Sequence, residues 1–309
     1  MKVLVTSKSF ASCSDEALHI LKDKGFEIIP NPKGRLLTEE EMMEYIQGVD
    51  AVILGTDVFS QKVIDCADKL KIVSRYGVGL DKVDCEYLKE KGIELKIAAN
   101  ANTNSVADHA VGLMLSVCHN ITRCDRYIHN GEWKKPMGKD LYQSTVGILG
   151  LGAIGKSVAR RVHGFDCKIL AFDKFYDDAF VEEYGIQKAS IDEIFELADF
   201  ITLHMPALPE FTPLITKETF AKMKDDAVLI NTARAKLIDQ EALYEAIEKN
   251  QIYGFGSDVH YQEPNIDEKL MQSENVVVTP HIAASSIGSI NNMSRIAAQN
   301  IVDYFEGKE

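Results

Sequence analysis

The chain has 309 residues, 46% of them hydrophobic and 26% charged, which is the composition of an ordinary globular protein. This length is more than a single hydrophobic core usually accommodates, so two domains are expected. The formal net charge of −13 argues against a nucleic-acid partner, whose phosphates it would repel.

The six cysteines form no CxxC pair, and no Cys/His cluster has the spacing of zinc ligands. Free thiols in a reducing compartment are therefore favoured over disulfides, and no metal site is expected. The first seven residues indicate a short strand rather than a signal sequence. The most apolar helical stretch, 111–117, is too short to span a bilayer. We expect a cytoplasmic protein without a membrane partner.

Short apolar runs alternate with amphipathic stretches through the first hundred residues. Strands are predicted at 3–5, 27–29, 51–54, 72–73 and 95–97. Helices are predicted at 15–24, 38–47, 61–67 and 84–91. The second of these helices begins with a capping box of Thr38 and Glu41. This alternation is typical of a parallel sheet covered by helices, here without a glycine-rich phosphate loop.

A single long helix is predicted from about Ser105 to Ile128. It has a broad apolar face and is too long to serve only as a crossover, so it either links two domains or packs against a second subunit. Six strands follow, at 146–149, 168–172, 200–203, 227–230, 253–257 and 276–278. Six strands with helices between them make a complete dinucleotide-binding sheet.

A last predicted helix, 287–305, remains after this sheet is finished, so we predict that it returns to the first domain. The predicted fold is α/β with two doubly wound parallel-sheet domains. An NAD-binding Rossmann domain, 101–284, is inserted in a flavodoxin-like substrate-binding domain, 1–100 plus 285–309.

A glycine motif at Gly150, Gly152 and Gly155 lies between a predicted strand and a predicted helix, and Asp173 ends the next strand. This is the order of a dinucleotide-binding βαβ unit. The glycines allow a sharp turn, room for the pyrophosphate and close packing, and the phosphates face the helix N-terminus. Asp173 would accept hydrogen bonds from the ribose and repel a 2′-phosphate, which favours NAD over NADP. Lys174 softens that preference, and a solvated strand end is the alternative role for Asp173.

Ionisable residues follow three later strands of the same predicted sheet: Arg234, Glu263 and His281. Ligands of such sheets bind beyond the carboxyl ends of the strands. Each residue alone has an ordinary structural explanation, as a surface ion-pair partner, an exposed turn residue or a turn cap. Their convergence beside a nucleotide-binding fold favours catalysis.

Eight segments, in order along residues 51–284, carry a resemblance to a known family. They are 75–84, 104–108, 147–155, 203–206, 231–235, 258–259, 263–264 and 279–284. Through them the chain resembles the D-isomer-specific 2-hydroxyacid dehydrogenases, a family that includes D-3-phosphoglycerate dehydrogenase, hydroxypyruvate/glyoxylate reductases and D-lactate dehydrogenase.

The resemblance implies reversible hydride transfer between NAD and C2 of a 2-hydroxy or 2-oxo acid. Arg234 would bind the substrate carboxylate and C2 oxygen, since its planar fork suits a carboxylate. His281 would be the general acid/base, and Glu263 would hydrogen-bond it and raise its pKa. Backbone N–H groups of Val78 and Gly79 would also bind the carboxylate.

The substrate-binding residues implied are Arg75, Tyr76, Gly77, Val78, Gly79, Arg234 and His281. The cofactor-binding residues implied are Gly150, Gly152, Ala153, Ile154, Gly155, Asp173, His204, Pro206, Thr232, Ala233 and Asp258. Of these, His204 and Pro206 would lie on the adenine side, and Ala233 and Asp258 on the nicotinamide side. The family resemblance also implies a homodimer.

The chain departs from the family pattern at three places. Ala235 and the pair 283–284 replace usual glycines, which are small changes. Residues 54–56 lack the arginine that phosphoglycerate-type members often carry for the substrate phosphate, although Arg75, Lys134 and Lys135 offer other cations. A phosphoglycerate dehydrogenase-like activity is the first expectation, and a hydroxypyruvate, glyoxylate or other non-phosphorylated 2-oxo acid reductase is the alternative.

Two rival functions remain. The first is an enzyme of this family acting on formate or phosphite, although formate enzymes usually have Gln where Glu263 stands. The second is an NADH-sensing binding protein of the transcriptional corepressor type. Such proteins usually carry extra tails, whereas this chain is expected to start at its first strand and end after its last helix.

Overall fold

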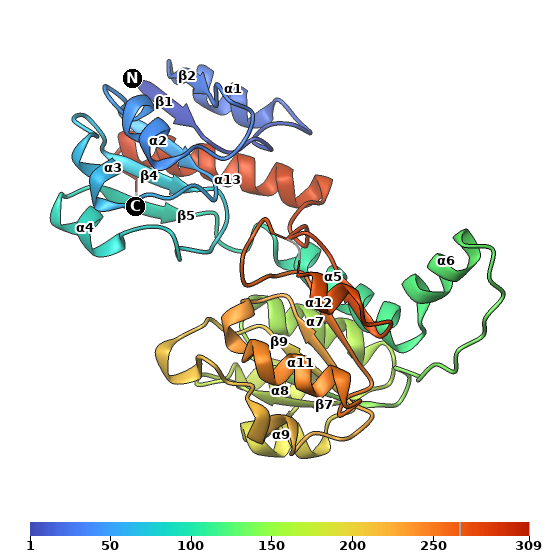
Figure 1. The fold of residues 1–309 in the computed structure, drawn as a ribbon. Coiled ribbons are helices and arrows are strands. Elements are labelled where there is room, and N and C mark those ends of the chain that lie inside the picture. Colours follow the sequence, from blue (N-terminus) through green and yellow to red (C-terminus); the bar gives the residue numbers. More distant parts are fainter. Residues whose placement is uncertain (266, 309) are drawn as a thin grey trace. The chain divides into compact units, whose positions relative to one another are not determined.

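The computed structural model describes residues 1–265 and 267–308. Glu309, the last residue of the expected discontinuous domain, lies outside them. The chain forms two compact units, Met1–Asn102 with Ala284–Glu309, and Thr103–Ala283. Each unit has its own fully parallel sheet (Figure 1). The predicted α/β class with two parallel-sheet domains is confirmed.

The sheet of the first unit has the strand order β2-β1-β3-β4-β5, which is that of flavodoxin-like folds. Its strands are β1 (Lys2–Val5), β2 (Glu27–Pro30), β3 (Ala51–Leu54), β4 (Ile72–Arg75) and β5 (Glu94–Ile97). Its helices are α1 (Glu16–Lys22), α2 (Glu39–Tyr45), α3 (Gln61–Asp65), α4 (Cys85–Glu90) and α13 (Ile287–Phe305). The predicted capping box of Thr38 and Glu41 is present at the start of α2.

Helices cover both faces of this sheet because alternate strand residues point to opposite sides. Val3 and Val5 pack in one buried cluster with residues of α1 and α13. Leu4, between them, packs in a second cluster with residues of α2, α3 and α4. The last helix is tied to the sheet by Asn300, whose amide donates to Ser74 Oγ and to the carbonyl oxygen of Ile97.

The sheet of the second unit has the order β12-β11-β10-β9-β6-β7-β8. Its strands are β6 (Thr145–Leu149), β7 (Lys168–Phe172), β8 (Gln187–Lys188), β9 (Phe200–Leu203), β10 (Val228–Asn231), β11 (Gly254–Ser257) and β12 (Val276–Val278). The prediction of six strands missed β8, an exposed pair of polar residues at the sheet edge. Two polar residues carry no hydrophobic pattern from which a strand is predicted.

The helices of the second unit also lie on both sheet faces. They are α5 (Thr103–Cys118), α6 (Ile121–His129), α7 (Ala153–His163), α8 (Asp178–Glu183), α9 (Ile191–Leu197), α10 (Lys217–Phe220), α11 (Gln240–Glu248) and α12 (Glu268–Met271). Residues of α5 and α7 pack with one set of strand side chains, and residues of α9 and α11 with the other. In the part of the chain that the structure describes, no helix is long and apolar enough to cross a membrane.

The single long helix predicted from Ser105 to Ile128 is wrong, because the chain breaks between α5 and α6. Asn120 adopts the left-handed conformation with φ 55°. Its side-chain amide donates to the carbonyl oxygen of Met137 at 3.2 Å and to Tyr253 Oη at 3.0 Å. Asparagine tolerates this conformation, and contacts distant in sequence fix it, so helical periodicity did not reveal the break. Figure 1 shows α6 lying apart from the sheet of its unit.

Candidate active site

Nearly all the expected cofactor and catalytic residues follow the carboxyl ends of neighbouring strands in the second unit. The register pairs Leu149 of β6 with Phe172 of β7 and Leu203 of β9. It continues from Leu203 to Asn231 of β10, and on through Ser257 of β11 to Val278 of β12. Strands in a parallel sheet lie about 4.8 Å apart, so these ends form one continuous edge. The order of strands reverses at β6, which is where such sheets bind dinucleotides.

The glycine loop between β6 and α7 has the geometry of a phosphate-binding turn. Gly150 has φ 98°, which favours glycine, and an added Cβ there would lie 2.7 Å from the backbone of His204. A Cβ on Gly155 would lie 2.0 Å from the carbonyl oxygen of Gly150. Gly152 is different, because a Cβ there would meet no atom within 4 Å. The open position lies at the N-cap of α7, where the N–H groups of Ala153 and Ile154 begin the helix.

Asp173 stands beside this loop at the end of β7. Its carboxylate accepts the N–H of Leu151 at 2.6 Å and the N–H of Phe175 at 3.1 Å. Each carboxylate oxygen has a second acceptor position, so both remain able to bind ribose hydroxyls. Lys174, which could have attracted a 2′-phosphate, is paired with Glu210 at 2.7 Å.

Two further groups on this edge fit a bound dinucleotide. Thr232, directly after β10, has a buried hydroxyl with no hydrogen-bond partner. Such an orphaned polar atom is costly unless a ligand or water satisfies it. His204, after β9, is half-buried, and its Nε2 lies 2.8 Å from Thr202 Oγ1. Burial lowers the pKa of His204 to about 3, so its imidazole is neutral; Pro206, two residues on, is exposed.

His281 and Glu263 lie in direct contact after β12 and β11. Nδ1 of His281 is 2.9 Å from both carboxylate oxygens of Glu263. Burial alone would raise the pKa of Glu263, but the hydrogen bond and charge of His281, with the N–H of His260, lower it below its ordinary value. Glu263 is therefore ionised and able to hold the imidazole through Nδ1. His281 has φ 54°, a strained conformation that is concentrated at functional sites.

Asp258 holds the segment that carries His281. Its side chain is 2% exposed, and it accepts the N–H groups of Ile282 and Ala283, each at 2.8 Å. Thr279 Oγ1 donates to the same carboxylate at 2.6 Å, and Nε2 of His109, on α5, lies 2.8 Å from Thr279 Oγ1. These contacts give Asp258 a positioning role that the expected place on the nicotinamide side did not include.

The turn that carries Arg234 is shaped by Asn231, which is 1% exposed. The Asn231 side chain accepts the N–H of Ala233 at 3.0 Å and donates to the carbonyl oxygen of Arg234 at 2.9 Å. Nη1 of Arg234 donates to the carbonyl oxygen of Ala233 at 2.7 Å. These bonds hold the half-buried Arg234 close to the end of β10.

The loop after β4 in the first unit is organised by Arg75, which is buried. Its guanidinium donates to the carbonyl oxygens of Gly79 at 2.8 Å and of Leu54 at 3.2 Å, and also to that of Tyr76. Gly77 has φ 125°, and Val78 is 39% exposed. Since carbonyl oxygens of this loop face its guanidinium, Arg75 shapes the turn. Its expected role in substrate binding stays a prediction. The Tyr76 hydroxyl lies 3.3 Å from Ser294 Oγ on α13.

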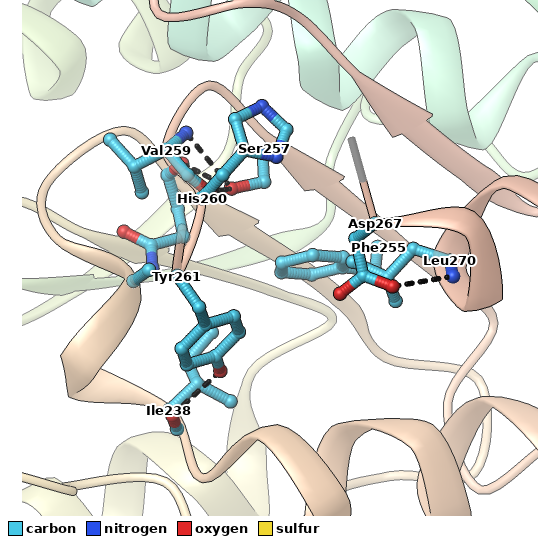
Figure 2. A pocket seen from close by; sticks show the side chains of 10 residues that line it. Ile238, Phe255, Ser257, Val259, His260, Tyr261, Asp267 and Leu270 are labelled. Atoms are coloured by element: carbon cyan, nitrogen blue, oxygen red, sulfur yellow. Dashed lines mark hydrogen bonds between the residues drawn. The ribbon is translucent and has the colours of Figure 1, made fainter. Parts of the chain in front are cut away.

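A small pocket opens on the second unit beside the ends of β10 and β11 (Figure 2). Asn231, Ser257, Tyr261 and Asp267 are among the residues that line it. The Tyr261 hydroxyl donates to the carbonyl oxygen of Ile238 at 2.7 Å, and Asp267 accepts the N–H of Leu270 at 3.2 Å. These bonds fix the walls of the pocket.

The sequence reasoning missed His109, Thr279 and His260 as parts of this site. His260 contacts both catalytic segments through Glu263 and Thr279. A histidine one residue after Val259 and a threonine just before Pro280 were the only sequence signals. Thr279 opens the family segment 279–284, but its contacts with His109 and His260 join different elements and give no local pattern.

The fold and site define a dinucleotide-dependent oxidoreductase, and comparison with known proteins places it more narrowly. Residues 111–283 match the family model for the NAD-binding domain of D-isomer specific 2-hydroxyacid dehydrogenases. The chain therefore belongs to this family, as its motifs indicated, and it is an NAD-dependent dehydrogenase acting on CH–OH groups.

Relatives with different substrates resemble the chain. A glyoxylate reductase of Korarchaeum cryptofilum is 36% identical over 88% of this chain and 84% of that protein. A D-3-phosphoglycerate dehydrogenase of Archaeoglobus fulgidus is 35% identical over 99% of this chain, which spans only 58% of that protein. The solved structure of D-lactate dehydrogenase from Escherichia coli has a TM-score of 0.88 at 27% identity and covers 100% of this chain and 98% of that one.

Two alanine substitutions in the glycine loop should separate ligand binding from packing. Gly152→Ala should weaken NADH binding at least tenfold without lowering the melting temperature, since the Cβ meets only the space where the pyrophosphate is expected. Gly155→Ala should cost about 1–3 kcal/mol of unfolding free energy, because its Cβ overlaps a backbone oxygen. NADH fluorescence titration and thermal unfolding without cofactor measure the two effects.

Gly112 provides the matched control. It lies on α5, and a Cβ there meets no atom within 4 Å. Gly112→Ala should therefore leave NADH affinity unchanged, and it should change the unfolding free energy by no more than the helix preference for alanine over glycine. Wild-type NADH affinity in Gly152→Ala would contradict the placement of the pyrophosphate.

Proposed function

We propose that this dehydrogenase reduces a small, non-phosphorylated 2-oxo acid of the glyoxylate or hydroxypyruvate type. The observation that carries the proposal is the character of the residues at and just after the end of β3. Leu54 is fully buried there, and Asp57, three residues on, is a buried carboxylate. Asp57 accepts hydrogen bonds from Thr6 Oγ1 at 2.5 Å and from the N–H of Leu37 at 2.8 Å. A buried acid at this position disfavours a substrate phosphate, which would be repelled.

The other cations considered for a phosphate have partners of their own. Arg75 donates to the carbonyl oxygens of its own loop. Lys134 pairs with Glu132 at 2.5 Å, and Lys135 lies over the ring of Trp133. D-3-phosphoglycerate remains the second candidate substrate, since 99% of this chain aligns with the Archaeoglobus D-3-phosphoglycerate dehydrogenase at 35% identity.

NAD, when bound, supplies the hydride acceptor or donor at its nicotinamide ring. In the mechanism we propose, Arg234 binds the substrate carboxylate and C2 oxygen through its planar guanidinium. Glu263 accepts the Nδ1–H of His281, which orients the imidazole and leaves Nε2 to pass a proton to the C2 oxygen. Backbone N–H groups of Val78 and Gly79 contribute to carboxylate binding.

The carboxylate–imidazole contact and the turn of Arg234 belong to adjacent strands of one sheet, and this supports the assignment. The asparagine that shapes the Arg234 turn and the aspartate that holds the His281 segment are both buried. Buried, fully bonded polar groups preorganise a site, so little reorganisation is needed during reaction.

Oxidation of NADH against a panel of acids tests the substrate. Glyoxylate or hydroxypyruvate should give kcat/KM at least tenfold above phosphohydroxypyruvate, because residues 54–56 offer a phosphate no cation and are followed by the buried carboxyl group of Asp57. Pyruvate and branched 2-oxo acids complete this panel, and formate and phosphite are tested separately, by the reduction of NAD. Preference for phosphohydroxypyruvate would reverse the order of the two candidates.

His281→Asn should abolish turnover, because asparagine transfers no proton at C2, while NADH binding stays nearly unchanged. Steady-state kinetics and NADH fluorescence titration measure the two quantities. Glu274→Gln, at an exposed carboxylate outside the site, serves as the control. If NADH affinity fell as much as turnover, His281 would have a structural rather than a catalytic role.

We also propose that the protein is a homodimer formed through α6 and the segment that follows it. Ile121, Ile128, Trp133 and Met137 are exposed there, Trp133 by 80% and Met137 by 89%. Several large apolar side chains exposed within one short segment favour a protein–protein contact.

The double substitution Trp133→Asp with Met137→Asp should convert the dimer to a monomer, since it places charges in the apolar contact. Sedimentation equilibrium measures the mass. Phe175→Asp is the control, because Phe175 is 85% exposed but follows β7 instead. A monomeric wild-type protein would refute this proposal.

A further inference from the structure

His260 contacts both catalytic segments of the second unit. It is half-buried in the segment after β11. Its backbone N–H donates to Glu263 Oε1 at 3.1 Å, and its ring Nε2 lies 2.9 Å from the carbonyl oxygen of Thr279. A carbonyl oxygen only accepts, so Nε2 of His260 carries a proton and donates it to this bond.

The turn at His281 depends on a hydrogen bond to the carbonyl oxygen of Thr279. The Thr279 N–H donates to the carbonyl oxygen of Ser257, which continues the β11–β12 pairing beyond Val278. The Thr279 carbonyl then accepts the N–H of His281 at 2.9 Å, across Pro280. His281 has φ 54°, a conformation that non-glycine residues adopt only when their surroundings impose it.

His260 and Tyr261 both line the neighbouring pocket, but their side chains point in different directions. Figure 2 shows the His260 and Tyr261 side chains on opposite sides of the segment that carries them. Tyr261 is directed towards Ile238, to whose carbonyl its hydroxyl donates. The ring of His260 thus reaches the strand end of β12, at the carbonyl oxygen of Thr279.

We propose that His260 is a positioning residue for proton transfer, holding the His281 turn through its ring and Glu263 through its backbone. This inference rests on the proposed role of His281. The ring bond fixes the direction of the Thr279 carbonyl, and the backbone bond fixes a carboxylate oxygen that contacts His281 Nδ1. One residue therefore sets the relative position of the acid/base and its carboxylate partner.

The proposal predicts different effects for two replacements. His260→Phe keeps a planar ring but removes the donor, so the Thr279 carbonyl loses one bond and the turn is held less tightly. His260→Gln keeps an N–H donor on a flexible side chain. His163→Phe is the matched control, since His163 is exposed at the end of α7, where its ring contacts Tyr184.

The experiment compares these variants with the best acid from the substrate panel. His260→Phe should lower kcat about tenfold with KM for NADH and NADH affinity within about twofold, the size expected for a lost hydrogen bond that acts in the reaction. His260→Gln should recover most of the loss, and His163→Phe should match wild type. Wild-type kcat in His260→Phe, or equal loss in the Gln and Phe variants, would overturn the proposal.

Hydrogen exchange in the protein without cofactor provides an independent readout. Amides of residues 279–283 should exchange faster in His260→Phe than in wild type, and at nearly the wild-type rate in His260→Gln. Unchanged exchange in His260→Phe would overturn the proposal even if the wild-type enzyme reduced none of the acids. Inactivity of the wild type towards the whole panel, with the exchange pattern as expected, would instead refute only the proposed function.

Discussion

The common register of β10, β11 and β12 is the constraint on which the site depends. Because the three strands are parallel and paired residue for residue, their ends lie on one edge, and the segments that leave them stand side by side. Arg234 leaves the first strand, Glu263 the second and His281 the third. The same edge continues through β9, β6 and β7, where His204, the glycine loop and Asp173 follow.

Buried polar groups then fix the segments that the strands deliver. Asp258 accepts two backbone N–H groups and a hydroxyl from the His281 segment, and Asn231 both accepts from and donates to the Arg234 turn. A buried carboxylate is costly unless its oxygens are bonded, so these side chains stabilise only the one loop arrangement that satisfies them. The strained backbone of His281 is tolerated because this network surrounds it.

Buried charged side chains also shape loops of the first unit. Arg75 is a buried cation that gathers backbone carbonyls, and Asp57 is a buried anion that gathers a hydroxyl and an N–H group. Both shape loops at the ends of parallel strands. The catalytic residues that we propose belong to the second unit, and we propose that the choice among 2-oxo acids depends on loops such as these.

The sequence by itself determined the order of elements, the glycine loop, the last helix and the candidate catalytic residues, because hydrophobic periodicity and motif spacing are local properties of the chain. It missed β8, placed one long helix across Asn120, and did not indicate that Arg75 binds the carbonyl oxygens of its own loop. Only the tertiary structure decided these points, and only it joined His109, Thr279 and His260 to the His281 segment. The physical reason is that a polar side chain takes its role from the groups it meets, and those groups come from strands and helices far away along the chain.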